Sequence, residues 1–121
     1  MPYAAITYDI KGGHEDEVAE VFQSFRRPRS AEVPGADGAP GARILATAVF
    51  IRDSTLVRFI EYEGDLDAVA RFMAAQPGVQ DLERRLAPYL NNARDTGTVE
   101  GFLATFKSSL LRPVVQFAVS R

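Results

Sequence analysis

The stretch RILATAVFIRDSTLVRFIEYE, residues 43–63, decides the fold. Two runs rich in β-branched and aromatic residues, 43–52 and 55–63, are separated only by Asp53 and Ser54. A two-residue connection between such runs is typical of a tight β-hairpin. The sequence therefore predicts two antiparallel strands joined at Asp53 and Ser54.

A two-residue turn also predicts which residues lie opposite one another in the hairpin. The pairs expected on one face are Val49 with Arg58, Thr47 with Ile60, and Leu45 with Tyr62. Arg58 and Tyr62 then project together from an otherwise apolar surface.

The segments around the hairpin alternate between strand and helix patterns. Apolar residues recur at helical spacing after residue 15 and again after residue 66, while Pro and Gly residues interrupt the pattern between 27 and 42. The expected elements are a strand over 3–10, a helix over 15–26, a loop over 27–42, a helix from 66 to Gln76, a third helix reaching Tyr89, a short helix capped by Thr98, and a strand over 113–119.

This order is β-α-β-β-α-β with extra helices before the last strand, which is the ferredoxin-like arrangement of an α+β fold. The 121 residues are enough for one core, so we expect a single domain over 1–121 with a flexible loop at 27–42. Both faces of the strand at 43–52 are largely apolar. One helical layer covers only one of them, so we expect a second copy to cover the other in a homodimer.

Composition excludes several classes of function. A net charge of −2 argues against a nucleic-acid-binding face, and the absence of cysteine removes disulfides and thiolate metal sites. The chain shows no signal peptide and no apolar stretch of membrane-spanning length. We therefore expect a cytoplasmic protein without metal, nucleic-acid or membrane partners.

Five stretches of the chain carry a family resemblance: GHEDEVAEVF at 13–22, FRRPRS at 25–30, TAVFIRDSTLVRFIEYEGDLDAVARFMAAQPGV at 47–79, LERRLAPYL at 82–90 and RDTGTVEGFLATF at 94–106. Together they resemble the SchA/CurD-like family of aromatic polyketide biosynthesis. The resemblance implies a dimeric α+β barrel related to antibiotic-biosynthesis monooxygenases and polyketide cyclases. The chain lacks Trp, and Phe72 stands where the wider group often has a histidine, so an oxygenase's polar pair is not carried over.

Three functions follow from this resemblance. The first is a cyclase or aromatase that needs no cofactor and acts on an aromatic, type II polyketide intermediate of antibiotic or spore pigment biosynthesis. The second is a cofactor-independent monooxygenase that forms a quinone on a polycyclic aromatic polyketide. The third is a non-catalytic partner of the polyketide synthase, with the acyl carrier protein among the possible contacts, because a fold alone does not confer activity.

Aldol cyclisation needs a base, a donor that polarises a carbonyl, and a pocket that excludes water. We expect Arg58 to stabilise an enolate oxygen and Tyr62 to donate a proton, because both project from one apolar face. The alternative for Arg58 is a buried ion pair with a carboxylate.

The opposite face of the hairpin offers a second set of candidates. Phe50 and Phe59 lie there beside small alanines and leave room for a substrate, and Glu61 is a candidate base. The alternative for Glu61 is a solvent-exposed residue near the end of its strand.

Three further residues complete the candidates. His14 is the only histidine and lies in a strand-to-helix turn, where it acts either as a catalytic base or as a cap; with no second histidine and no cysteine, no metal site is expected. Tyr8 either lines a pocket mouth or seals the core. Arg26 begins a small basic cluster that either binds substrate or the acidic surface of a carrier protein, or is solvated.

Overall fold

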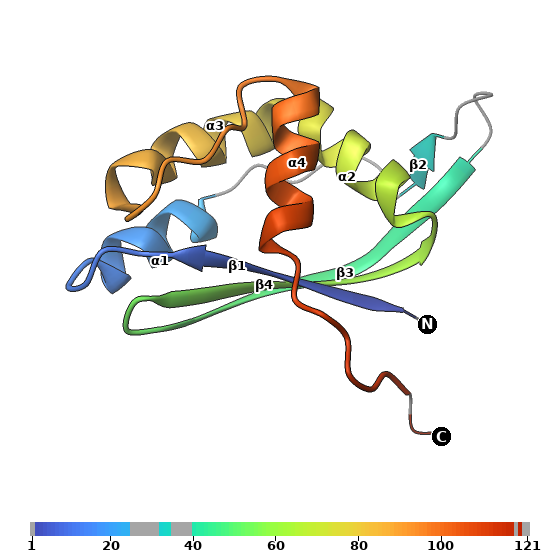
Figure 1. Cartoon of the computed structure of the whole chain (residues 1–121), viewed down its shortest axis with the longest axis horizontal. Helices are drawn as coiled ribbons and strands as arrows, with labels where there is room; N and C mark the ends of the chain where they lie inside the picture. Colours follow the sequence, from blue (N-terminus) through green and yellow to red (C-terminus); the bar gives the residue numbers. More distant parts are fainter. Residues whose placement is uncertain (1, 25–31, 35–39, 118, 120–121) are drawn as a thin grey trace.

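The computed structural model describes residues 2–24, 32–34, 40–117 and 119, with an antiparallel sheet on one side and helices on the other (Figure 1). The elements are β1 (Tyr3–Asp9), α1 (Glu15–Gln23), β2 (Glu32–Pro34), β3 (Pro40–Arg52), β4 (Thr55–Gly64), α2 (Leu66–Ala75), α3 (Pro77–Leu86), η1 (Ala87–Tyr89) and α4 (Val99–Ser109). The strand order in the sheet is β1-β4-β3-β2. The predicted α+β class is confirmed.

The hairpin of β3 and β4 forms as predicted. Arg52 pairs with Thr55, and Asp53 takes a positive φ of 53°, which Asp tolerates better than most residues. The pairs of Val49 with Arg58 and Thr47 with Ile60 are confirmed. The predicted pair of Leu45 with Tyr62 is wrong.

A register shift between Ile44 and Ala46 causes this difference. It removes Leu45 from the ladder and places Ile44 opposite Tyr62. Leu45 is the extra residue of a β-bulge and has no partner in β4. The residue before a bulge points to the face opposite the one that strict alternation would give it. Ile44 therefore shares the face of Arg58 and Tyr62.

Helix ends follow capping chemistry. The Asp65 side chain accepts from the backbone N–H of Asp67 at 3.0 Å at the start of α2, and Thr98 accepts from the N–H of Gly101 at 3.0 Å at the start of α4. Tyr89, predicted within the third helix, lies in η1. The first helix ends at Gln23, and residues 25 and 26 of its predicted range lie outside the described residues.

The predicted loop at 27–42 is wrong where the structure describes it. Glu32–Pro34 forms β2, and β3 begins at Pro40, with Val33 pairing with Ala42. Pairing with β3 provides hydrogen bonds for backbone N–H and C=O groups that would otherwise bond to water. Residues 27–31 and 35–39, where the loop was expected to be flexible, lie outside the described residues.

The predicted strand at 113–119 does not form in the described part of that range. The chain instead runs beside β1, with one bridge between Ile6 and Leu110 and one bond from Leu111 N to the Ala5 carbonyl at 2.8 Å. Beyond it, the Gln116 side chain bonds to the backbone of Tyr3, at 3.0 and 2.8 Å. A side-chain amide thus occupies the edge positions that a strand backbone would need.

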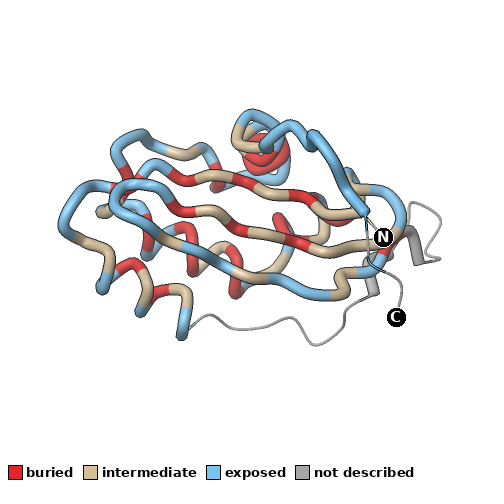
Figure 2. The backbone as a smooth tube through the Cα atoms, turned by 90° about the horizontal axis from the view of Figure 1, so that it is seen from below, coloured by how far each residue is buried: buried red, intermediate tan, exposed pale blue. Residues whose placement is uncertain are grey.

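The core lies between one face of the sheet and the helices. Alternate residues of β1 and β4 are buried there, and their neighbours face the other side, as Figure 2 shows from that side. All described helices lie on the same side of the sheet (Figure 1). The opposite face is open, and Phe50 is 64% exposed on it.

Candidate functional site

Four polar side chains meet between the sheet and the helices. They are Tyr8 from β1, Arg58 from β4, Glu83 from α3 and Arg94 from the segment between η1 and α4. The first three are only 3%, 7% and 5% exposed, and the Arg94 side chain is 11% exposed. Burying a charge is costly unless it is paired and hydrogen-bonded, so interactions within this cluster must hold it in place.

Glu83 joins two members of the cluster. Its Oε1 accepts from Arg94 Nε at 2.9 Å, and its Oε2 accepts from the Tyr8 hydroxyl at 3.4 Å. The Arg94 guanidinium carbon lies 4.2 Å from the centroid of the Tyr8 ring, which is a cation–π distance. Phe22 packs edge-on against the same ring, with centroids 6.0 Å apart. Tyr8 is therefore fixed at its hydroxyl and at its ring.

The environment of Tyr8 keeps its hydroxyl protonated. Burial raises the pKa of Tyr8 above its usual value of 10.0, and the negative charge of Glu83 raises it further. The charges of Arg58 and Arg94 and a hydrogen bond with Arg58 lower this pKa in part. At neutral pH Tyr8 is thus a neutral hydrogen-bond donor beside two cations.

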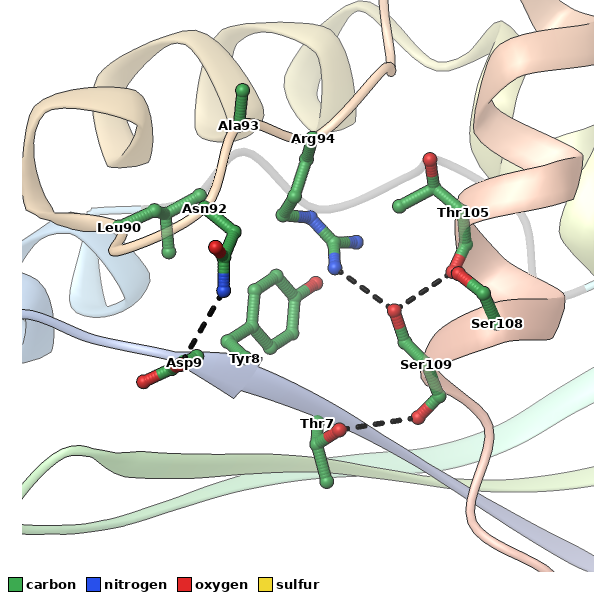
Figure 3. A pocket seen from close by; sticks show the side chains of 10 residues that line it. All are labelled: Thr7, Tyr8, Asp9, Leu90, Asn92, Ala93, Arg94, Thr105, Ser108 and Ser109. Carbon is green, nitrogen blue, oxygen red and sulfur yellow. Dashed lines mark hydrogen bonds between the residues drawn. The ribbon is translucent and has the colours of Figure 1, made fainter.

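A polar cavity of about 270 Å³ opens beside the cluster (Figure 3). Its lining residues are Thr7, Tyr8, Asp9, Leu90, Asn92, Ala93, Arg94, Thr105, Ser108 and Ser109. Arg94 Nη1 donates to Ser109 Oγ at 3.1 Å, and Ser109 Oγ donates to the Thr105 carbonyl at 2.7 Å. Arg94 has five N–H donors and uses two in these described bonds with Glu83 and Ser109. Its others are available to a ligand oxygen.

Asp9 supplies a carboxylate to the same cavity. It ends β1, and its Oδ1 and Oδ2 accept from the side-chain amides of Asn91 at 2.8 Å and Asn92 at 3.4 Å. These bonds join the sheet to the segment that carries Arg94. The cavity therefore holds a carboxylate, a guanidinium and a phenol hydroxyl on connected elements.

A smaller apolar cavity of about 60 Å³ lies against Arg58. Its lining residues are Ile44, Thr47, Arg58, Ile60, Phe72, Met73, Gln76 and Val79. Arg58 acts on the pKa of Tyr8, which lines the polar cavity. Tyr8 and Arg58, which interact with each other, thus lie between the polar cavity and the apolar cavity.

Arg58 and Tyr62 share the helix-facing side of β4 but line different cavities. Tyr62 lines a third cavity of about 270 Å³, together with Tyr3, Ala4, Leu66, Leu110, Leu111, Pro113 and Gln116. Arg58 does not line that space, and Tyr62 does not line the apolar cavity. None of these three cavities is lined by both Arg58 and Tyr62, so their shared cavity stays a prediction.

Glu61, Phe59 and Phe50 lie on the open face of the sheet. Phe59 is half-buried and stacks on Tyr3 with ring centroids 5.1 Å apart. Glu61 is half-buried opposite Tyr3 and Ala46. These residues are therefore separated from the buried cluster by the sheet.

His14 lies at the start of α1 and lines none of these three cavities. Its Nδ1 is 2.6 Å from Glu17 Oε2, and its ring lies 5.4 Å from that of Tyr89. Its side chain is 42% exposed. Arg26 lies outside the described residues.

Sequence reasoning missed Glu83 and Arg94. Glu83 stands four residues after Val79 and three before Leu86, so it lies on the apolar face of α3. A carboxylate on that face could have been recognised from the sequence as a buried functional candidate. Arg94 follows a polar break and offered no comparable pattern. Only the tertiary structure brings it to Glu83.

Within the described part of the chain, no helix is long and apolar enough to cross a membrane. The same residues contain no group of three or more His, Cys, Asp or Glu side chains placed to hold a metal ion.

The architecture is an α+β fold shared with a polyketide cyclase. The solved structure described as tetracenomycin F2 cyclase from Streptomyces glaucescens, a type II polyketide cyclase, superposes with a TM-score of 0.59 over 99% of this chain and 100% of the other, at 17% identity. The likeness at this identity concerns the fold.

The chain belongs to the SchA/CurD-like domain family, which it matches over residues 1–119. It is 37% identical over 93 residues to a 42.8 kDa protein in the whiE locus of Streptomyces coelicolor, covering 77% of this chain and 22% of that protein. It is 34% identical to polyketide synthase CurD of Streptomyces cyaneus and 32% identical to protein SchA of Streptomyces halstedii, covering 91% and 96% of this chain. The chain spans only 28% and 29% of those two relatives.

Proposed function

We propose that this protein is a cyclase or aromatase that acts without a cofactor on an aromatic, type II polyketide intermediate. The observation that carries the proposal is the buried cluster of Tyr8, Glu83 and Arg94 beside the polar cavity. Membership of the SchA/CurD-like family and the fold shared with a type II polyketide cyclase support it.

The lining residues can supply the chemistry of an intramolecular aldol reaction. Asp9 accepts a proton from the carbon between two carbonyls, and the resulting enolate carbon attacks a second carbonyl carbon of the same chain. A carbon–carbon bond forms, and the new alkoxide takes the proton back from Asp9, which regenerates the carboxylate. Loss of water then leads toward an aromatic ring, and no oxidant or reductant is consumed.

Arg94 stabilises the negative charge that develops on oxygen, because it contributes a permanent cation to the cavity wall. Tyr8 stays protonated at neutral pH and donates its one O–H to Glu83, so it supports the position of Arg94 rather than the reacting oxygen. Both are held by Glu83 before any ligand arrives, so little reorganisation is needed during the reaction.

The open face of the sheet supports a homodimer as part of this proposal. Phe50 is 64% exposed and lies beside other apolar side chains of β4 on that face. A second copy would cover this surface and remove it from water. The carrier protein that would present a tethered polyketide is a further proposed partner.

The test combines the purified protein with a reconstituted minimal aromatic polyketide synthase. We expect a change from the spontaneous products to one cyclised product, equally under air and under argon. A product that forms only under air, with oxygen consumed, would favour a monooxygenase instead. No change in the products, with the protein still bound to the synthase, would favour a non-catalytic partner.

The matched control for the site is an exposed arginine on the helical layer. Arg71→Gln removes a cation whose side chain is 60% exposed, and it should leave the product profile unchanged. An equal effect of Arg71→Gln and of a variant at Arg94 would contradict a role for the polar cavity.

A further inference from the structure

Glu83 is a buried carboxylate that does not line the polar cavity. Its side chain is 3% exposed, and it projects from the buried stripe of α3 beside Leu82 and Leu86. An acid in this position is rare unless it has partners. Its role must therefore be sought in the groups that it holds.

The two oxygens of Glu83 divide between two groups that do line the cavity. Oε1 binds Arg94 Nε at 2.9 Å, and Oε2 accepts from the Tyr8 hydroxyl at 3.4 Å. Binding through Nε leaves the Nη atoms of Arg94 for other partners. One of them bonds to Ser109 Oγ at 3.1 Å on the cavity wall.

Arg94 comes from an irregular segment and would otherwise sample many rotamers. Three contacts from three elements remove that freedom: Glu83 on α3, Ser109 on α4 and the Tyr8 ring on β1. A guanidinium fixed in this way keeps its remaining donors in one orientation at the cavity that it lines.

We infer that Glu83 is a positioning residue that fixes Arg94 as the binding site for an enolate-type oxyanion in the polar cavity. The inference rests on the proposed function for its biological ligand. The chemistry of the ligand follows from the site: the planar guanidinium of Arg94 is a permanent cation with several N–H donors, so it recognises a delocalised oxygen anion. The volume of about 270 Å³ admits a six-membered ring, since a cavity of about 150 Å³ holds benzene.

The probe is 1,3-cyclohexanedione, which is ionised to a delocalised enolate at neutral pH, and the comparison compound is neutral cyclohexanone. Binding is followed by NMR, through the side-chain Nε–H signal of Arg94 and the backbone amides of Thr105 and Ser109. We expect the dione to shift these signals at saturation and cyclohexanone to leave them unchanged.

Glu83→Gln removes the charge and keeps the shape. We expect the Arg94 Nε–H signal to lose its protection from exchange and the affinity for the dione to fall roughly tenfold to a hundredfold, as expected for a charge-assisted contact. Asp81→Asn, which removes a partly exposed carboxylate from the same helix, is the matched control and should change neither reading.

Glu83→Asp keeps the charge but shortens the side chain. It is the second test of the positioning role if Glu83→Gln fails to fold. It should lose affinity because one carboxylate no longer reaches both partners. A folded Glu83→Gln or Glu83→Asp protein with a protected Arg94 signal and unchanged dione affinity would overturn the inference. So would a wild-type protein that binds the dione and cyclohexanone equally. A protein that binds the dione as expected but leaves the synthase products unchanged would overturn only the proposed function.

Discussion

The guanidinium of Arg94 lies over the ring of Tyr8 at 4.2 Å, and both side chains bond to the same carboxylate, Glu83. This arrangement joins a residue near the end of β1 to a segment more than 80 positions later in the chain. The position of each of these three side chains therefore depends on the other two.

Replacing Arg94 alone would remove a hydrogen-bond donor from the cavity and leave the buried Glu83 carboxylate without its cation. Arg94→Gln should lower cyclisation by roughly a hundredfold, the usual scale for one oxyanion donor, and cost about 3 to 5 kcal/mol of stability. The double variant Glu83→Gln with Arg94→Gln should recover much of the stability because no unpaired charge remains. Thermal melts beside product assays separate the two effects: a double variant that regains both stability and activity would contradict a role for Arg94 in the reaction.

Tyr8 should make the stability of the protein fall at alkaline pH. Its folded pKa is raised above the unfolded value near 10.0, so its contribution is fully present below pH 10 and is lost as pH rises toward the folded pKa. Unfolding free energies measured from pH 8 to pH 11 should show this decline in wild type and a smaller one in Tyr8→Phe. Parallel curves for the two proteins would contradict the raised pKa.

Arg58 acts on Tyr8 with the opposite sign from Glu83. Its charge and hydrogen bond lower the Tyr8 pKa, so Arg58→Gln should shift the phenol titration to higher pH. The absorbance change near 295 nm, with Tyr8→Phe subtracted to isolate this phenol, measures the shift. The same variant should also lose stability because Arg58 is only 7% exposed. An unchanged titration would show that Arg58 does not act on Tyr8 in solution.

The open sheet face should hold two copies together. Phe50→Asp places a charge on that face without touching the core, because Phe50 is 64% exposed in the single chain. We expect light scattering to give a dimer for wild type and a monomer for this variant. Val99→Asp, on a residue 41% exposed at the start of α4, is the matched control and should remain dimeric. A wild-type monomer at micromolar concentration would contradict the proposed dimer.

The side chain of Asp95 lies against Gly101 at the start of α4. A Cβ at this position would lie 2.5 Å from Asp95 Oδ1 and 2.6 Å from its Cγ, so Gly101→Ala makes the exposed Asp95 side chain turn aside. In wild type this adjustment should offset most of the gain in helix propensity, so we expect a change in stability of less than about 0.5 kcal/mol. In an Asp95→Ala background the same change should stabilise by up to about 1 kcal/mol, because only propensity then acts. Denaturant titrations of the four proteins measure this difference, and equal effects in the two backgrounds would contradict the contact.

The sequence determined the local elements of this protein. The turn at Asp53 and Ser54, the cap at Thr98 and the break at Pro77 depend on residues close in the chain, so propensity and capping specify them. The register near the turn was also predictable, since a two-residue connection fixes the first pairs. The bulge at Leu45 was not, because it lies far from the turn and only packing decides it.

The tertiary structure decided the site. From the sequence, Arg58 was predicted either to stabilise an enolate oxygen or to form a buried ion pair, and Tyr8 either to line a pocket mouth or to seal the core. Their connection to Glu83 and Arg94 depends on how α3 and the segment before α4 pack over β1. The placement of residues 110–116 beside β1 likewise depends on tertiary contacts, which include those of the Gln116 side chain. Periodicity shows which face of an element is buried, but contacts between distant elements are fixed only when those faces pack together.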